Sequence, residues 1–166
     1  MNKPTRIERT IRPSGKALGA GDYSVLDPAT ADARFGLSAR LDRVDMPLEP
    51  LTDGHEVRVY EGDLIVDEFD GPSDGGDGSH NVVVDGNLIV KGKLSWTEYA
   101  GGSFLVVTGA ISAGAIHARG CPVLFASHLE AETVVGCEDG GDGGAIVATT
   151  IRAGLVLQTS YFRVEG

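Results

Sequence analysis

The sequence predicts an all-β fold: a short right-handed parallel β-helix, or solenoid, of about five irregular coils with an N-terminal cap. Three observations support this prediction, namely a degenerate repeat of coil length, an aliphatic composition and many glycines. Of the 166 residues, 42% are hydrophobic but only 6% are aromatic, so the core must be mainly aliphatic. The 24 glycines follow no collagen period, and they indicate many tight turns between short strands.

The repeat consists of an apolar triplet, a small or polar bend, and then alternating aliphatic and polar positions. It occurs in VRVYEGDLIV (57–66), NVVVDGNLIV (81–90), FLVVTGAISA (104–113), PVLFASHLEA (122–131) and AIVATTIRA (145–153). The aligned aliphatic residues are Leu64, Leu88, Ile111, Leu129 and Ile151, at spacings of 24, 23, 18 and 22 residues. Coils of this length, stacked at about 4.8 Å, would bury these residues in one continuous column.

Each unit is expected to hold about two strands, the second of them around Leu94, Ile116, Val134 and Val156. Gly62, Gly86 and Gly109 fall at the bend, where a residue without Cβ can adopt a positive φ. A two-layer β-sandwich is the alternative fold, because short strands at similar spacing also occur there.

The chain is expected to form one structural domain with two parts, an arm and cap in residues 1–50 and β-helix repeats in residues 51–166. Within the cap, Asp27 and Pro28 predict the start of a helix that ends before Gly36, with Asp27 as N-cap. The cap would cover the open strand edge of the first coil, since bare edges invite uncontrolled pairing.

Charge is distributed unevenly along the chain. The net charge is −10, yet residues 1–17 carry five basic residues and one acid. Residues 44–90 carry twelve acids and one base, Arg58. Such a field repels phosphate backbones and attracts cationic proteins, so we expect a basic protein partner and no nucleic acid.

The units EGDLIV, DGNLIV and TGAISA resemble those of bactofilins, the bacterial polymer-forming β-helix proteins, over residues 57–166. The chain is more similar to irregular relatives of that group that occur beside bacterial toxin genes. That resemblance implies an immunity protein, and the resemblance to bactofilins themselves implies a self-assembling scaffold.

Two segments, SDGGDGS (73–79) and EDGGDGGA (138–145), are similar to the Gly-Asp loops that bind calcium in β-rolls. Because tandem copies are missing, solvated loops that contact a partner are the preferred interpretation. The four histidines lack metal-ligand spacing, and Cys121 and Cys137 form no CxxC pair. We therefore predict no metal site and no cofactor.

Catalysis by a β-helix usually requires paired carboxylates along one stacked groove. The row Asp63, Asn87, Ala110, His128 and Thr150 offers no such pair. The next row, Ile65, Ile89, Ser112, Glu130 and Arg152, places an acid beside a base, for which an ion pair between coils is a sufficient explanation. We expect no catalytic residues and no enzymatic activity.

These observations predict a non-enzymatic acidic binding protein, an immunity-type inhibitor that neutralises a cationic bacterial toxin domain by covering its site. The expected partner-binding residues are Asp63, Asp67, Glu68, Asp70, Asp74, Asp77, Asp139 and Asp142. The alternative is a bactofilin-like scaffold, which would self-associate. Because no stretch approaches about 20 apolar residues and the N-terminus carries no signal-peptide pattern, we expect no membrane contact and a cytoplasmic location.

Overall fold

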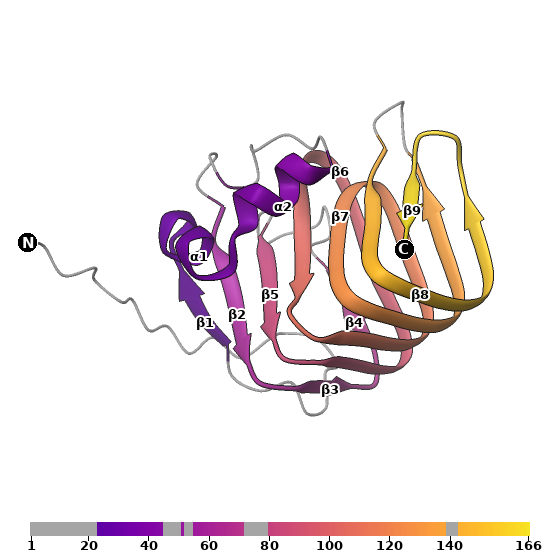
Figure 1. Ribbon diagram of the computed structural model, residues 1–166, viewed down its shortest axis with the longest axis horizontal. Coiled ribbons are helices and arrows are strands. Elements are labelled where there is room, and N and C mark those ends of the chain that lie inside the picture. The colour runs from indigo at the N-terminus through magenta and orange to yellow at the C-terminus, as the bar shows by residue number, and fades with distance from the viewer. Residues whose placement is uncertain (1–22, 45–50, 52–54, 72–79, 139–142) are drawn as a thin grey trace, which may run out of the picture.

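The structure is a computed structural model that describes residues 23–44, 51, 55–71, 80–138 and 143–166, with the backbone alone at residues 98–102 and 121. It forms a parallel β-solenoid of about four turns, so the predicted fold class is confirmed (Figure 1). The elements are β1 (Tyr23–Leu26), α1 (Pro28–Phe35), α2 (Leu37–Arg43), β2 (Val57–Glu61), β3 (Leu64–Val66), β4 (Phe69–Asp70), β5 (Asn81–Asp85), β6 (Leu88–Val107), β7 (Ala110–Cys137), β8 (Ala145–Gln158) and β9 (Arg163–Glu165).

Each coil has three sides, whereas the sequence suggested about two strands. In the first coil β2, β3 and β4 each form one side, which we call side one, side two and side three. β2 pairs in parallel with β5, and β3 and β4 both pair in parallel with β6. The longer strands β6, β7 and β8 bend around the corners and continue from side to side.

The predicted alignment of coils on side two is confirmed. Leu64 pairs with Leu88, Leu88 with Ile111, and Leu129 with Ile151. Leu88, Ile111 and Leu129 are at most 1% exposed and belong to one hydrophobic cluster that runs through the solenoid. The aliphatic column inferred from the spacing is therefore the core.

Side one is buried on both of its faces, which explains why its strands read as apolar triplets rather than as an alternation. Its inward residues join the solenoid core. Its outward residues, such as Val83 and Phe125, pack in a second cluster with Phe35, Leu37 and Leu41 from the helices. Figure 1 shows α1 and α2 lying across this side of the solenoid.

The predicted helix start is confirmed. The Asp27 carboxylate accepts a hydrogen bond from the Thr30 backbone N–H at 3.0 Å, Pro28 is the first helical residue, and Gly36 ends α1 with φ 61°. The covering of the first coil differs from expectation, because β1 pairs antiparallel with β2 and covers the edge at side one only. The helices pack on the outer face of side one instead of over the end of the coil.

The expected role of the bend glycines holds at one position of three. Gly62 has φ 82°, but Gly86 and Gly109 have no positive φ. They are required for close stacking instead, since a Cβ atom on Gly86 would lie 2.5 Å from the Gly62 carbonyl oxygen. A Cβ atom on Gly109 would lie 2.7 Å from the Gly86 carbonyl oxygen. The prediction of positive φ was therefore wrong for Gly86 and Gly109.

The attachment of α2 is expected to weaken in acid. The Asp32 carboxylate accepts hydrogen bonds from the Ser38 hydroxyl at 2.5 Å and the Ser38 backbone N–H at 2.7 Å, and these bonds lower the pKa of Asp32 below its ordinary value of 3.8. A lowered folded-state pKa stabilises the protein above the unfolded-state pKa, and this contribution is lost as pH falls through the folded-state value. Asp32→Ala should therefore cost about 1.5 kcal/mol in unfolding free energy at pH 7 and clearly less at pH 3, measured by urea unfolding. An equal cost at both pH values would contradict this assignment.

Candidate functional site

The outward surface of side two in the first two coils combines acids with exposed aliphatic residues. Along β3, Leu64 and Val66 point into the core while Ile65 between them is 49% exposed. Ile89, its register partner in β6, is 36% exposed. We call this surface the acidic face and define it by Asp63, Ile65, Asp67, Glu68 and Ile89. In Figure 1 it lies around the strand labelled β3.

Asp63 is fixed in place by the coil beneath it. One of its carboxylate oxygens accepts hydrogen bonds from the Asn87 backbone N–H at 2.8 Å and from the Asn87 side-chain amide at 3.0 Å. The Asn87 amide oxygen in turn accepts a hydrogen bond from the Ala110 N–H at 2.9 Å. This ladder of side chains runs along the bend, so the position of the Asp63 charge is set by the backbone stacking.

Asp67 and Glu68 at the other end of β3 differ in their partners. Asp67 forms an ion pair with Lys91 of the next coil at 2.9 Å, and both side chains are largely exposed, so the pair contributes less than about 1 kcal/mol. Glu68 and Asp70 are exposed, and neither takes part in an ion pair within the part of the chain that the structure describes. These two carboxylates are available to a partner.

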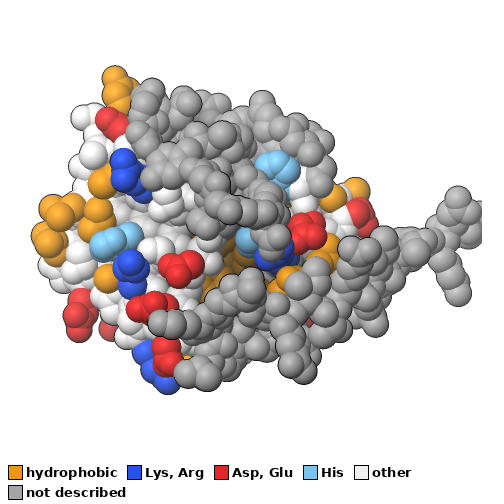
Figure 2. Space-filling view, turned by 180° about the vertical axis from the view of Figure 1, so that it is seen from behind, with side chains coloured by type: hydrophobic (Ala, Val, Ile, Leu, Met, Phe, Trp, Pro, Cys, Tyr) orange, Lys and Arg blue, Asp and Glu red, His pale blue; other side chains and the backbone are white. Residues whose placement is uncertain are grey.

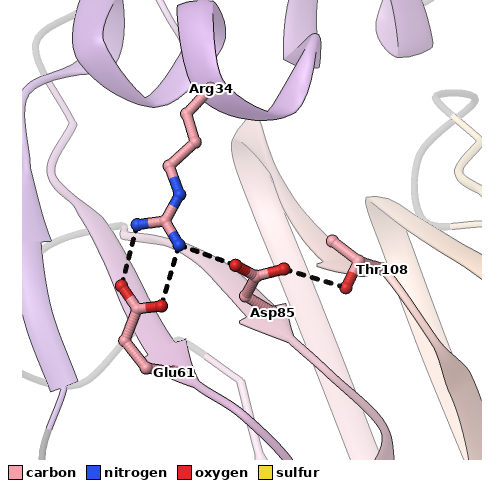
Figure 3. A network of polar contacts seen from close by, with 4 residues as sticks. All are labelled: Arg34, Glu61, Asp85 and Thr108. Atoms are coloured by element: carbon pink, nitrogen blue, oxygen red, sulfur yellow. Dashed lines mark hydrogen bonds and ion pairs between the residues drawn. The ribbon is translucent and has the colours of Figure 1, made fainter.

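Glu61 and Asp85 instead share one cation from the cap. Arg34 of α1 donates hydrogen bonds to both carboxylate oxygens of Glu61 at 2.8 Å and to Asp85 at 2.6 Å (Figure 3). The Thr108 hydroxyl donates to the other Asp85 oxygen at 3.1 Å. The hydrogen bond to Glu61, followed by that to Asp85, raises the pKa of Arg34. The network ties α1 to the ends of β2 and β5.

The acidic field is therefore weaker than the sequence count suggested. Within residues 44–90 Arg58 was the only base, and it pairs with Glu56 at 2.6 Å. Arg34 and Lys91 lie outside that segment, but folding places them against its acids. Among the described acids of that segment, Asp63, Glu68 and Asp70 form no ion pair with another described residue, and all three lie on or next to the acidic face.

Four of the predicted partner-binding residues lie on the first coil: Asp63, Asp67 and Glu68 at the two ends of β3, and Asp70 in β4 on side three. The other four, Asp74, Asp77, Asp139 and Asp142, lie outside the described residues. The exposed Ile65 and Ile89 were missing from the predicted site. Their signal was present in the sequence, because the later coils carry Ser112, Glu130 and Arg152 at the same outward position.

A second surface feature lies on the later coils. An open groove of about 730 Å³ is lined by Ser112, Glu130, Glu132, Arg152 and Gly154, among others. Glu130 and Arg152 are register partners, as expected. Among the described residues, however, Glu130 and Arg152 do not form the ion pair that was expected between them. The two side chains therefore keep their charges toward solvent.

Within the described ranges, no group of three or more His, Cys, Asp or Glu side chains is placed to hold a metal ion. The helices in those ranges are all too short or too polar to cross a membrane. A scan against models of protein families and searches of curated proteins and of solved structures found no match to this chain.

Proposed function

We propose that this chain is a non-enzymatic acidic binding protein, an immunity-type inhibitor that neutralises a cationic bacterial toxin domain by covering its site with the acidic face. The observation that carries the proposal is the stacked, exposed pair Ile65 and Ile89 with Asp63, Asp67 and Glu68 around it. Ile65 and Ile89 are stacked neighbours and not isolated residues, and the same outward position is polar in the later coils, at Ser112, Glu130 and Arg152.

The arrangement has the anatomy of a protein-binding surface. Binding sites concentrate affinity in a few desolvated side chains at the centre, with a polar rim that excludes water. Ile65 and Ile89 would form the centre, and the carboxylates would form the rim. Complementary charge at a rim accelerates association and discriminates between partners more than it adds affinity.

The alternative expectation, a self-assembling scaffold, is less favoured by the shape of the two ends. β1 adds one strand beyond β2 on side one, and β9 adds one strand beyond β8 on the same side. If side one of one copy met side one of the next, these two strands would hold sides two and three about 10 Å further apart than strand pairing allows. Flat end-to-end stacking would leave both edges unpaired there.

The first test of the proposal reverses Glu68 of the acidic face and the nearby Asp70, neither of which forms an ion pair with another described residue. Partners are recovered from the source cells with the tagged protein and identified, and association is then measured with the purified partner at low and high salt. Glu68→Lys with Asp70→Lys should slow association about tenfold at low salt and much less at high salt, because salt screens the steering field. Ile65→Ser with Ile89→Ser should instead accelerate dissociation about tenfold.

The matched control is Glu130→Lys with Glu132→Lys, which changes the net charge equally on a later coil and leaves the residues of the acidic face unchanged. Equal slowing by both charge-reversed variants would mean that net charge, and not the acidic face, guides binding. Recovery of the chain itself as the sole partner, assembled into filaments that the variants still form, would replace the inhibitor with the scaffold.

A further inference from the structure

The described part of the chain begins next to the acidic face. Residues 1–22 lie outside the described residues, and Tyr23, the first described residue, pairs with Tyr60 near the end of β2. Because β1 runs antiparallel to β2, β1 starts at the corner between side one and side two. Asp63, where the acidic face begins, follows Tyr60 by three residues at this corner. The residues before Tyr23 are therefore tethered beside the acidic face.

The tether is long enough for residues 1–17, which we call the basic arm, to reach the centre of the acidic face. Lys16 precedes Tyr23 by seven residues, and a chain of seven residues spans at most about 25 Å. Ile65 follows Tyr60 by five residues, so these two lie at most about 18 Å apart. Pairing between Tyr23 and Tyr60 adds about 5 Å. Lys16 can therefore lie over Ile65 without any change in the described fold.

The basic arm complements the acidic face in both charge and hydrophobicity. It carries five basic residues and one acid, and Ile7 and Ile11 lie between arginines in the segment RIERTIR (6–12). The acidic face presents its own two isoleucines among carboxylates, of which Asp67 alone forms an ion pair with another described residue. Two aliphatic residues flanked by cations therefore match two aliphatic residues flanked by carboxylates.

A second group of exposed hydrophobic residues matches the basic arm less well. Leu155 and Leu157 are 50% and 51% exposed. Figure 2 shows hydrophobic side chains gathered at the left edge of the molecule, which is the C-terminal end of the solenoid seen from behind. Residues 150–163, which include both leucines, carry two arginines and no acid, whereas residues 61–70 carry five acids and no base. Charge therefore favours the acidic face as the binding site of a basic segment.

We propose that the basic arm binds the acidic face of the same chain, with Ile7 and Ile11 against Ile65 and Ile89 and the arginines of the arm against the carboxylates. Tethering favours this contact, because a short tether holds the arm at an effective concentration on the order of 1 mM. A contact that is weak between separate molecules is then populated within one molecule.

The basic arm would compete with any cationic protein for the acidic face, and proteins of poor complementarity would fail to displace it. This consequence rests on the proposed function. The contact between arm and face does not, because it involves this chain alone. The test below therefore uses no partner protein, and its failure is distinguishable from a failure to find a cationic partner.

Isoleucine methyl groups report the contact directly. The chain has eight isoleucines, so labelling the δ1 methyl groups of the full chain with ¹³C on a deuterated background gives few signals. At low salt we expect nuclear Overhauser effects between the methyl groups of Ile7 or Ile11 and those of Ile65 or Ile89. High salt should weaken these effects and shift the methyl resonances of the acidic face, because it screens the attraction.

Two charge-reversed variants make the result specific. Arg9→Glu with Arg12→Glu, the arm variant, should abolish the effects between arm and face and shift the methyl resonances of the face. The matched control is Arg43→Glu with Arg152→Glu, which changes the net charge equally at two exposed residues outside the arm and the face. The control should keep the contact. Circular dichroism checks that both variants fold.

A synthetic peptide with the sequence of residues 1–17 measures the competition. The arm variant should bind this peptide at the acidic face, followed by the methyl resonances of Ile65 and Ile89. The control variant has the same net charge but keeps its own basic arm, so it should bind the peptide about threefold more weakly. A factor of this size is expected when the effective concentration is about twice the dissociation constant of the arm.

Four outcomes would overturn the proposal. The first is the absence of nuclear Overhauser effects between arm and face at low salt. The second is an equal loss of these effects in the arm variant and the control, which would indicate a response to net charge alone. The third is contact of the arm with the Ile151 methyl group instead of the face. The fourth is a contact that disappears on dilution, because the arm would then belong to a second copy.

Discussion

Leu88→Asp is expected to abolish folding at room temperature. Leu88 is fully buried between Leu64 and Ile111, and the described residues offer no cation facing this column. An unpaired carboxylate there costs several kcal/mol, in addition to the loss of the buried leucine, and native domains have only about 5–15 kcal/mol in total. Ile111→Asp should have the same effect, since Ile111 is 1% exposed in the next coil. Circular dichroism and thermal melting measure the result.

Ile89→Asp is the matched control for Leu88→Asp. It introduces the same charge one residue further along the same strand, but at an outward position that is 36% exposed. This variant should retain the fold and lose at most about 1 kcal/mol of unfolding free energy. If Leu88→Asp and Ile89→Asp melted alike, the inward and outward assignment of side two would be wrong.

Trp96→Ala is expected to cost about 3–5 kcal/mol of unfolding free energy. Trp96 is fully buried on side three, where its ring stacks against Phe69 with centroids 6.2 Å apart and planes inclined by 16°. Its indole N–H donates to the Ser103 hydroxyl at 2.7 Å. Truncation opens a large cavity and leaves the buried Ser103 without this partner, and both effects destabilise the fold.

Trp96→Phe and Ser103→Ala separate the two contributions. Trp96→Phe keeps an aromatic ring against Phe69 but loses the hydrogen bond, so its cost should fall clearly below that of Trp96→Ala. The double variant with Ser103→Ala should recover part of the difference, because the unsatisfied hydroxyl is removed. Unfolding is followed by circular dichroism, since Trp96 is the only tryptophan of the chain. A cost below 1 kcal/mol for Trp96→Ala would contradict the packing described here.

The coil alignment could be predicted because stacking imposes one repeated position on every coil. Spacings of 24, 23 and 22 residues between aligned leucines and isoleucines became the observed register pairs. The start of α1 was also predictable, since Asp27, Pro28 and Gly36 are local capping signals. The first signal depends on a position that recurs in each coil, and the second depends on residues that are close in sequence.

The third side of each coil and the true charge of the acidic face were harder to predict. The corner between sides two and three contains glycines such as Gly114, and no turn motif in the sequence marks it. Glycine is needed there because a Cβ atom on Gly114 would lie 2.9 Å from the Gly92 carbonyl oxygen of the neighbouring coil. Similarly, Arg34 is 27 residues from Glu61 and 51 from Asp85, so counting charges within a segment cannot reveal their pairing. Contacts of this kind depend on where the cap packs, which the repeat does not encode.

The path of α1 and α2 has a consequence for how the solenoid can come apart. In a simple repeat protein each coil contacts only its neighbours, so terminal coils can fray one at a time. Here the helices share one hydrophobic cluster with residues from β2 through to β8, and the Arg163 side chain of β9 donates a hydrogen bond to the Val44 carbonyl at the end of α2. Contacts distant in sequence therefore join the first coil to the last through the helices. Loss of one coil would therefore disturb packing along the whole of side one. Because of this shared packing, we expect the coils to unfold as one cooperative unit and not one at a time.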